Sequence, residues 1–269
     1  SIERQGDIAL IIIDNPPVNA TGQVVRQGLQ DVITRLNEEG TAKVIAIYAE
    51  GRTFVAGADI TEFGKPPQPP ALPDVLNVIE ASAIPVISVL HGTALGGGFE
   101  LGLSTHARIG IKGLRVGLPE ILLGLLPGAG GTQRLPRIAG IPFTLDMALS
   151  GRQVQAEEAL EKGVIDRLVD TTPREAALQA AQDVIDGKLE THRTCDLQTV
   201  PDDKALEDTA AMLKAKQAHL YSPHKVVEAV AASTGPLSEG LKIERQAFMD
   251  SMQTPQRAGL IHAFFGERA

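Results

Sequence analysis

Short apolar runs rich in β-branched residues alternate with helical patterns in the first two thirds of this chain, and this alternation restricts its fold most. Residues 7–14 read DIALIIID and are followed by Asn15-Pro16-Pro17, which is typical of a strand that prolines terminate. Apolar residues then recur at helical spacing from Val25 to Leu36. The runs KVIAIYA at 43–49 and PVISVL at 85–90 read as buried strands. The alternation predicts an α/β class.

From about Thr172 onward the pattern predicts helices only, and the polar segment 189–203 reads as a connector. The expected helices cover residues 174–187, 203–220, 223–234 and 237–269. We therefore predict an α/β core with the active site over residues 1–190, and a helical C-terminal region over residues 191–269.

Composition excludes several classes of protein. The net charge is −8 and no block of Lys and Arg stands out, so we expect no nucleic-acid partner. The longest apolar runs, such as residues 8–13, are far shorter than the roughly 20 residues of a membrane helix, and no membrane span is expected. Cys195 is the only cysteine, which excludes an intrachain disulfide.

Residues 91–105, HGTALGGGFELGLST, place three glycines before a glutamate in an apolar segment. Such a stretch costs stability unless a function requires it. It is no dinucleotide fingerprint, because Leu101 stands where the third glycine is needed, and no Walker A loop, because Gly98 occupies the lysine position. No serine lies in a Gly-x-Ser-x-Gly context and the six histidines form no metal-binding motif, so we expect no metal site.

Two acidic residues that lie in apolar segments remain as candidates for catalysis. Glu100 follows the glycines and is expected on the first turn of a buried helix, and Glu120 lies 20 residues later in VGLPEILL. Each could instead cap a helix or pair with an arginine such as Arg108 or Arg134.

A third stretch, GRTFVAGADIT at 51–61, has the small residues of a tight turn whose backbone N–H groups face outward. One of these N–H groups and one in the glycine run could converge on a single oxygen as an oxyanion hole. Two such donors together with two acids describe a site for a carbonyl compound that becomes an enolate.

Taken together, these stretches resemble the crotonase (enoyl-CoA hydratase/isomerase) superfamily over about residues 5–190. The motifs that carry the resemblance are AGADI (56–60), HGTALGGGFELGL (91–103), GLPEILLGLLPGAGGTQRLPR (117–137) and SGRQVQAEEALEKGVID (150–166). The resemblance implies a spiral of ββα units followed by a helical region. It also places the oxyanion donors on the Ala56 and Gly97 N–H groups, and the two hydratase acids on Glu100 and Glu120.

The same resemblance implies an acyl-CoA thioester as substrate, with CoA as part of the substrate and no separate cofactor. The residues expected to contact it are Ala58, Asp59, Ile60, Gly96, Phe99 and Leu118. Lys65 and Arg26 are weaker candidates for contacts with the anionic groups of CoA. The proline-rich segment 62–73, EFGKPPQPPALP, is expected to be either a surface connection or a wall over the site.

The expected activity is hydration of trans-2-enoyl-CoA to 3-hydroxyacyl-CoA in fatty-acid β-oxidation. Two alternatives stay open: a Δ3,Δ2-enoyl-CoA isomerase that uses the same site, and an acyl-CoA-binding module without catalysis. The expected location is the cytoplasm in a bacterium, and a peroxisome or mitochondrion in a eukaryote.

The segment 221–269 resembles the connector that joins a crotonase domain to an NAD-dependent 3-hydroxyacyl-CoA dehydrogenase domain, with IERQAF and HAFFGERA as the carrying residues. We therefore expect fusion to such a domain. The residues at 260, 261, 264 and 265 form an apolar stripe that must be covered, and the alternative is that it packs on its own core in a complete protein.

Overall fold

The computed structural model describes residues 1–59, 62 and 65–266, with side chains as far as Ile261. The chain divides into two compact units, residues 1–116 with 154–197 and residues 117–153 with 198–269. This differs from the linear division expected at residue 190, because residues 117–153 belong with the C-terminal helices. Their apolar side chains form a common core with α9 (Ser222–Ala231), which a division along the sequence cannot represent.

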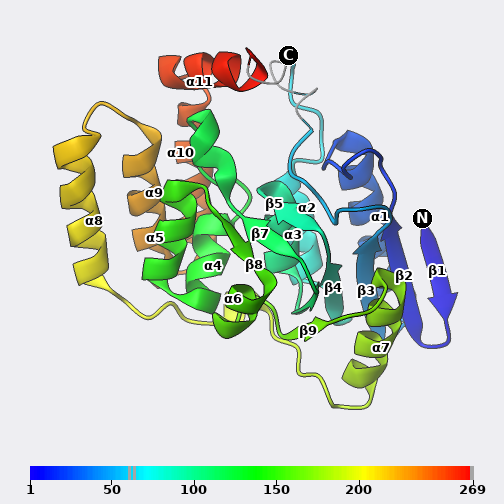
Figure 1. Ribbon diagram of the computed structural model, residues 1–269. Coiled ribbons are helices and arrows are strands. Elements are labelled where there is room, and N and C mark those ends of the chain that lie inside the picture. Colours follow the sequence, from blue (N-terminus) through cyan, green and yellow to red (C-terminus); the bar gives the residue numbers. More distant parts are fainter. Residues whose placement is uncertain (60–61, 63–64, 267–269) are drawn as a thin grey trace. The chain divides into compact units, whose positions relative to one another are not determined.

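The first unit contains a six-stranded sheet, a small three-stranded sheet and the helices between the strands (Figure 1). Its elements are β1 (Ile2–Gln5), β2 (Ile8–Ile13), α1 (Gln23–Glu39), β3 (Val44–Ala49), α2 (Leu72–Glu80), β4 (Val86–Leu90), β5 (Thr93–Leu95), α3 (Gly97–Ser104), β6 (Ala107–Ile111), β7 (Arg115–Gly117), β8 (Gln153–Gln155), α6 (Ala156–Glu161), β9 (Arg167–Val169), α7 (Pro173–Ile185) and η3 (Thr194–Asp196).

The larger sheet has the order β1-β2-β3-β4-β6-β9, and β5-β7-β8 form the smaller one. β1 pairs antiparallel with β2, whereas β2, β3, β4, β6 and β9 pair in parallel. All six residues of β2 and all six of β3 are buried, as expected for central strands of a sheet covered on both faces. The α/β expectation is confirmed, with strands where DIALIIID, KVIAIYA and PVISVL stand.

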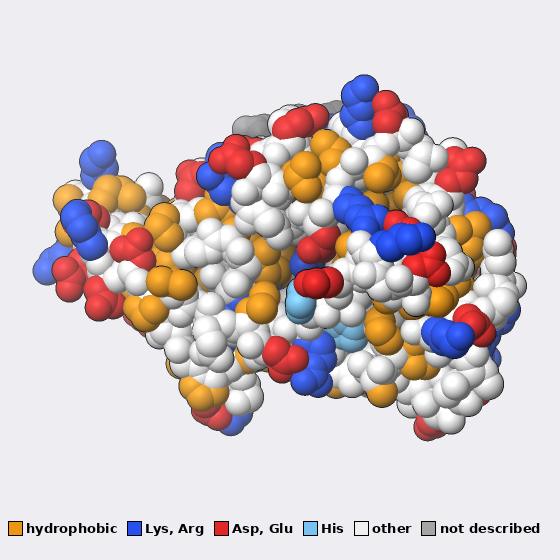
Figure 2. Space-filling view, turned by 90° about the horizontal axis from the view of Figure 1, so that it is seen from below, with side chains coloured by type: hydrophobic (Ala, Val, Ile, Leu, Met, Phe, Trp, Pro, Cys, Tyr) orange, Lys and Arg blue, Asp and Glu red, His pale blue; other side chains and the backbone are white. Residues whose placement is uncertain are grey.

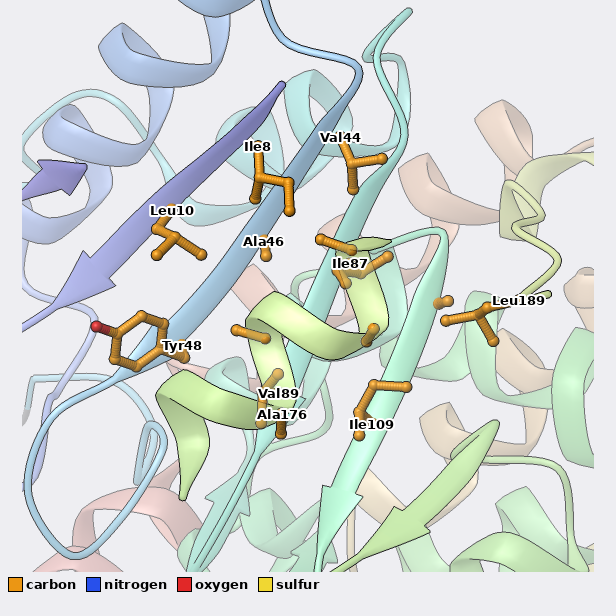
Figure 3. Close-up of a cluster of buried hydrophobic side chains, with 14 of the residues drawn as sticks. Ile8, Leu10, Val44, Ala46, Tyr48, Ile87, Val89, Ile109, Ala176 and Leu189 are labelled. Carbon is orange, nitrogen blue, oxygen red and sulfur yellow. The ribbon is translucent and has the colours of Figure 1, made fainter. Parts of the chain in front are cut away.

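One face of this sheet is covered by α7 (Figure 3). Ala176, Ala177, Ala180 and Ala181 of this helix are buried against the strands. Figure 3 labels Ala176 of this helix next to Val89 of β4, and both belong to one cluster with Leu10 and Ala46. Because alanine side chains are small, they let the helix backbone come close to the strands.

Helix α1 packs Leu29, Ile33 and Leu36 into the core, as the sequence pattern predicts. Gly28 stands in the same series, but it is exposed, and a Cβ there would have no neighbour within 4 Å. Packing therefore does not require a glycine at residue 28, and its main effect is to increase the conformational entropy of the unfolded chain.

We expect Gly28→Ala to raise the free energy of unfolding by about 0.5 to 1 kcal/mol, measured by urea denaturation. Gly130→Ala is the contrasting variant, since Gly130 has a φ of 107° and a Cβ there would lie 1.9 Å from Arg134 Nη1. Gly130→Ala should lower the free energy of unfolding. A destabilised Gly28→Ala protein would show that this stretch of α1 tolerates no side chain.

The second unit consists mainly of helices. Its elements are η2 (Pro119–Leu123), α4 (Gly131–Ala139), α5 (Ile141–Ser150), α8 (Asp203–Lys216), α9, η4 (Ala232–Thr234), α10 (Leu237–Ser251) and α11 (Pro255–Gly266). The single helix expected over residues 237–269 is interrupted between Ser251 and Pro255, because a proline cannot continue the hydrogen bonding of a helix but starts one readily. None of the described helices is both long and apolar enough to cross a lipid bilayer.

A buried carboxylate ties α10 to the start of α4. Glu244 is 1% exposed and accepts hydrogen bonds from the Gly130 N–H (2.6 Å), the Thr132 N–H (2.8 Å) and the Thr132 hydroxyl (2.6 Å). The first turn of a helix has unsatisfied N–H groups and a positive dipole end, and a carboxylate meets both needs. Glu244 belongs to IERQAF, so this part of the expected connector contributes to the core of its own unit.

Candidate active site

The backbone conformation and the close neighbours of the triple glycine explain why these positions carry no side chain. Gly96 precedes α3 with φ 52° and ψ −127°, a conformation that residues with a side chain rarely adopt. A Cβ at Gly98 would lie 2.1 Å from the Val55 carbonyl oxygen and 2.6 Å from Val55 Cβ. The glycines therefore allow the start of α3 to lie directly against the segment that contains Val55.

Gly97 is the first residue of α3, where the N–H groups have no partner within the helix and the dipole is positive. A Cβ at this position would lie 2.7 Å from Leu72 Cδ2, at the start of α2, and 3.5 Å from Thr21 Oγ1. Any side chain at residue 97 would thus occupy the space beside its own N–H group.

The AGADI segment runs beside the glycine run. Val55 forms a parallel bridge with Ala94, and the Leu95 N–H donates to the Val55 carbonyl oxygen at 3.1 Å. Gly57 then has a φ of 122°, a value that residues with a side chain rarely adopt. The two stretches from which we expected the oxyanion donors are therefore neighbours in the first unit.

One expected oxyanion donor needs correction. The Ala56 N–H donates a hydrogen bond to the Val18 carbonyl oxygen at 3.1 Å. An amide has a single hydrogen to donate, so this group is already used within the fold. Ala58, two residues later, is exposed. Within the described part of the chain, neither the Ala58 N–H nor the Gly97 N–H donates a hydrogen bond.

Glu100 lies on the first turn of α3 and is 2% exposed. Every residue of α3 is buried, so the expectation of a buried helix with an acid on its first turn is confirmed. Arg108, one of the arginines considered as a partner, pairs with Asp166 at 3.3 Å and donates to the carbonyl oxygens of Val164 and Thr105. Arg108 therefore has a structural role of its own.

Glu120 belongs to the second unit and lies in the short helix η2. Its side chain is half-buried, and its Oε2 atom is inaccessible to solvent. The backbone around it is held by a hydrogen bond from the Leu125 N–H to the Glu120 carbonyl oxygen at 3.1 Å. Leu118, expected to line the substrate site, is fully buried just before this helix.

The remaining expected contact residues lie in the first unit. Phe99 is fully buried in α3, and Asp59 lies beside α1, where a Cβ at Gly22 would come 3.0 Å from Asp59 Oδ2. Ile60 lies outside the described residues. Lys65 is exposed and stays a candidate for a contact with CoA.

Arg26 is a structural residue, in contrast to the expectation of a contact with CoA. It is 7% exposed, and its guanidinium donates to Glu62 Oε2 (2.8 Å) and to the carbonyl oxygens of Thr21 (2.8 Å), Gln68 (2.9 Å) and Pro70 (2.8 Å). Four of its five N–H donors are thus used within the fold. These bonds hold the proline-rich segment against α1, a role that no sequence signal indicates.

Two histidines of the first unit, His91 and His106, are buried. His106 accepts a hydrogen bond at Nδ1 from the Val86 N–H (3.1 Å) and has Nε2 3.0 Å from the Glu80 carbonyl oxygen. His91 has Nε2 3.2 Å from the Gly51 carbonyl oxygen. Burial lowers the pKa of both imidazoles below the usual value. His91, the histidine nearest the glycine run, therefore has the environment of a structural residue.

We expect the free energy of unfolding to fall as the pH is lowered from 7 to 5. The unfolded chain takes up protons at these histidines near pH 6.5, whereas the folded chain resists until a lower pH because their pKa is depressed. Urea denaturation at several pH values measures this. His106→Gln should flatten the dependence, whereas His192→Gln, whose side chain is 61% exposed, should leave it unchanged. An unaltered slope in His106→Gln would contradict the assignment.

Among the described residues no group of three or more His, Cys, Asp or Glu side chains could hold a metal ion. On the face shown in Figure 2, acidic and basic side chains are interspersed and do not form one broad basic area. The features of this chain that point to chemistry are therefore the two glutamates and the paired backbone segments.

A family model described as "Enoyl-CoA hydratase/isomerase" matches residues 3–196. The "Peroxisomal bifunctional enzyme" of Danio rerio is 40% identical over 265 residues, which is 97% of this chain and 37% of that protein. A "Peroxisomal fatty acid beta-oxidation multifunctional protein" of Arabidopsis thaliana is 33% identical over 278 residues, which is 97% of this chain and 38% of that protein. The chain thus spans less than two fifths of the length of these relatives.

A solved structure from Pseudoalteromonas atlantica, described as an enoyl-CoA hydratase/isomerase, matches this chain with a TM-score of 0.74. The match covers 100% of this chain and 97% of that chain. The two are 20% identical, so this similarity shows the fold alone. The expected crotonase-like fold with a helical C-terminal region is confirmed.

Proposed function

The chain belongs to the enoyl-CoA hydratase/isomerase family, and from this premise we propose that it adds water to trans-2-enoyl-CoA and gives 3-hydroxyacyl-CoA in fatty-acid β-oxidation. The observation that carries the proposal is the packing of the AGADI segment directly against the start of α3, next to the buried Glu100.

The Gly97 and Ala58 N–H groups are the proposed oxyanion hole. When water adds at C3, negative charge develops on the thioester oxygen, and two fixed N–H donors stabilise that enolate. Ala58 replaces Ala56 in this role because the Ala56 N–H is bonded to Val18. Gly97 contributes the N–H at the positive end of α3, with no side chain between it and the substrate.

Glu100 and Glu120 are the proposed acid and base, by their correspondence to the two glutamates of the family's hydratases. Glu100 takes a proton from the water whose oxygen bonds to C3, and Glu120 gives a proton to C2. The burial of Glu100 and of the Glu120 Oε2 atom supports these roles, because proton transfer benefits from a site with little competing solvent.

Hydration changes no overall oxidation state, and the thioester already activates the double bond. We therefore propose no metal or redox cofactor for this step, with CoA bound as part of the substrate. The Δ3,Δ2-enoyl-CoA isomerase activity is the second candidate, since the name of the family includes both reactions. There, Glu120 would move a proton between C2 and C4 while the same N–H groups hold the enolate.

The ultraviolet absorbance of the conjugated enoyl thioester tests the proposal. A hydratase consumes the conjugated bond of trans-2-enoyl-CoA, so absorbance falls when protein is added. An isomerase acting on trans-3-enoyl-CoA creates that bond, so absorbance first rises. Unchanged absorbance with both substrates, together with binding of acyl-CoA, would establish a binding module without catalysis and overturn the proposal.

The relatives are described as bifunctional or multifunctional proteins, and this chain covers 37% to 38% of the two compared above. We propose that in the whole protein it is fused to a 3-hydroxyacyl-CoA dehydrogenase domain, which would oxidise the product of hydration. Sequencing the parent gene beyond codon 269 tests the fusion: a strand followed by Gly-x-Gly-x-x-Gly supports it, and an immediate stop codon contradicts it. The proposed compartment is a peroxisome or mitochondrion in a eukaryote, and the cytoplasm in a bacterium.

A further inference from the structure

We propose that Thr21 is a positioning residue for the oxyanion hole, because it orients the Ala58 N–H and fixes its distance from Gly97, while Arg26 holds Thr21 in place. The inference rests on the proposed function, in which the Ala58 and Gly97 N–H groups receive the thioester oxygen.

Thr21 lies just before α1 and is 2% exposed. Its N–H donates to the Gly57 carbonyl oxygen at 2.9 Å, and its hydroxyl donates to the same oxygen at 3.2 Å. Both polar donors of Thr21 are therefore directed at a single backbone oxygen 36 residues away.

The Gly57 carbonyl and the Ala58 N–H belong to the same peptide unit. In a planar trans peptide the C=O and N–H bonds point in opposite directions. Two hydrogen bonds that hold the Gly57 oxygen therefore also fix the direction of the Ala58 N–H, which points away from Thr21. Hydrogen bonds accepted by the carbonyl also polarise the peptide unit, which makes its N–H a stronger donor.

Thr21 also lies close to the second donor. Its Oγ1 atom lies 3.5 Å from the position that a Cβ would take at Gly97. The same side chain thus forms a hydrogen bond with the AGADI segment and lies next to the start of α3. Thr21 is therefore placed to set the spacing between the two N–H groups.

Arg26 fixes Thr21 from the other side. Its Nη1 donates to the Thr21 carbonyl oxygen at 2.8 Å and also to Glu62 Oε2 at 2.8 Å. The Nε and Nη2 atoms bind the carbonyl oxygens of Pro70 and Gln68. A planar guanidinium with several donors in fixed directions holds these groups in one arrangement. Thr21 therefore cannot turn away from Gly57 without breaking contacts that Arg26 maintains.

Thr21→Val tests the inference, because valine has nearly the same shape but lacks the hydroxyl. We expect kcat for hydration to fall about 3- to 10-fold, the size of effect that follows from losing one neutral hydrogen bond. KM should change less than about twofold, because the contacts with the rest of the substrate are unaltered. Thr21→Ser retains the hydroxyl and should keep a kcat close to that of the unaltered protein.

A spectroscopic measurement separates orientation of the donor from simple loss of stability. A conjugated aryl-acryloyl-CoA absorbs at longer wavelength when strong hydrogen bonds polarise its thioester carbonyl. The red shift on binding should be smaller in Thr21→Val than in the unaltered protein and in Thr21→Ser. The matched control is Thr194→Val, since Thr194 is 1% exposed and its hydroxyl donates to the Leu103 carbonyl oxygen at 2.9 Å. It should lower the melting temperature but leave kcat and the red shift unchanged.

The outcomes distinguish this inference from the proposed function. If the unaltered protein neither hydrates enoyl-CoA nor shifts the absorbance of the probe, the proposed function is wrong. If the unaltered protein does both but Thr21→Val keeps its full kcat and red shift, Thr21 does not position the donor. An equal loss of kcat in Thr194→Val would assign the effect to stability and also overturn the inference.

Discussion

Glu100→Gln and Glu120→Gln are each expected to lower kcat for hydration of trans-2-enoyl-CoA by at least about 100-fold. General acid–base catalysis contributes about 10²- to 10⁴-fold, and glutamine has nearly the same volume but can neither accept nor supply the proton. KM should change little, because neither substitution removes a contact with CoA. Initial rates from the loss of enoyl absorbance measure both constants.

Glu80→Gln is the matched control for these variants. Glu80 is also a buried glutamate, 4% exposed in α2, and it accepts a hydrogen bond from the Cys195 N–H at 3.1 Å. Its substitution should affect stability and leave kcat within about twofold, since it lies outside the proposed catalytic groups. Near-normal turnover in Glu100→Gln or in Glu120→Gln would remove that residue from the mechanism.

Assays of both glutamate variants with trans-3-enoyl-CoA, the substrate of an isomerase, distinguish the roles of the two residues. If Glu120 alone transfers the proton between C2 and C4, Glu120→Gln should abolish isomerisation as well as hydration. Glu100→Gln should then retain isomerisation, because that reaction adds no water. Equal loss of both activities in both variants would contradict this division of roles.

Local sequence patterns were sufficient to predict the elements that carry Glu100. The run that becomes β4 is continuously apolar, and the glycines mark where the chain changes direction, so β4 and the buried start of α3 follow from neighbouring residues alone. Similarly, the amphipathic spacing up to Leu36 predicts α1. Pro255 is a local signal for the break before α11, because a proline cannot continue the hydrogen bonding of a helix.

Long-range contacts explain what the sequence did not reveal. The Ala56 N–H is unavailable because of the Val18 carbonyl oxygen, and no spacing within AGADI shows this. In the sequence, Arg26 looks like an ordinary surface cation, but in the fold its guanidinium donates to four oxygen atoms. Residues 117–153 join the second unit because their apolar side chains form a common core with those of α8, α9 and α10, which follow much later in the chain.

Thr21 illustrates the same limit for the candidate site. A threonine just before a helix reads as a capping residue, yet the side chain makes no cap for α1 and bonds Gly57 instead. Glu62 provides the cap, with Oε1 accepting from the Gln23 N–H at 2.7 Å. The partner of each polar group thus depends on which distant segment the fold brings beside it.

Gly97→Val is expected to lower kcat by about 100-fold, the loss typical of removing one oxyanion donor. A Cβ at this residue would lie 2.7 Å from Leu72 Cδ2, so the added side chain must displace the leucine and crowd the space beside the N–H. Because the contact involves the end of a flexible side chain, the fold should survive. KM should change much less than kcat, since the oxyanion interaction is strongest in the transition state.

Gly97→Ala and Gly102→Ala form a matched pair that tests whether the effect depends on position. Both residues lie in α3, and a Cβ at Gly102 would also press on a leucine, with Leu90 Cδ2 at 3.2 Å. Gly97→Ala should lower kcat less than Gly97→Val but in the same direction, whereas Gly102→Ala should change stability without lowering kcat. The red shift of a bound aryl-acryloyl-CoA should decrease only in the variants of residue 97. If Gly97→Val keeps the kcat and the red shift of the unaltered protein, the oxyanion donor lies elsewhere in the chain.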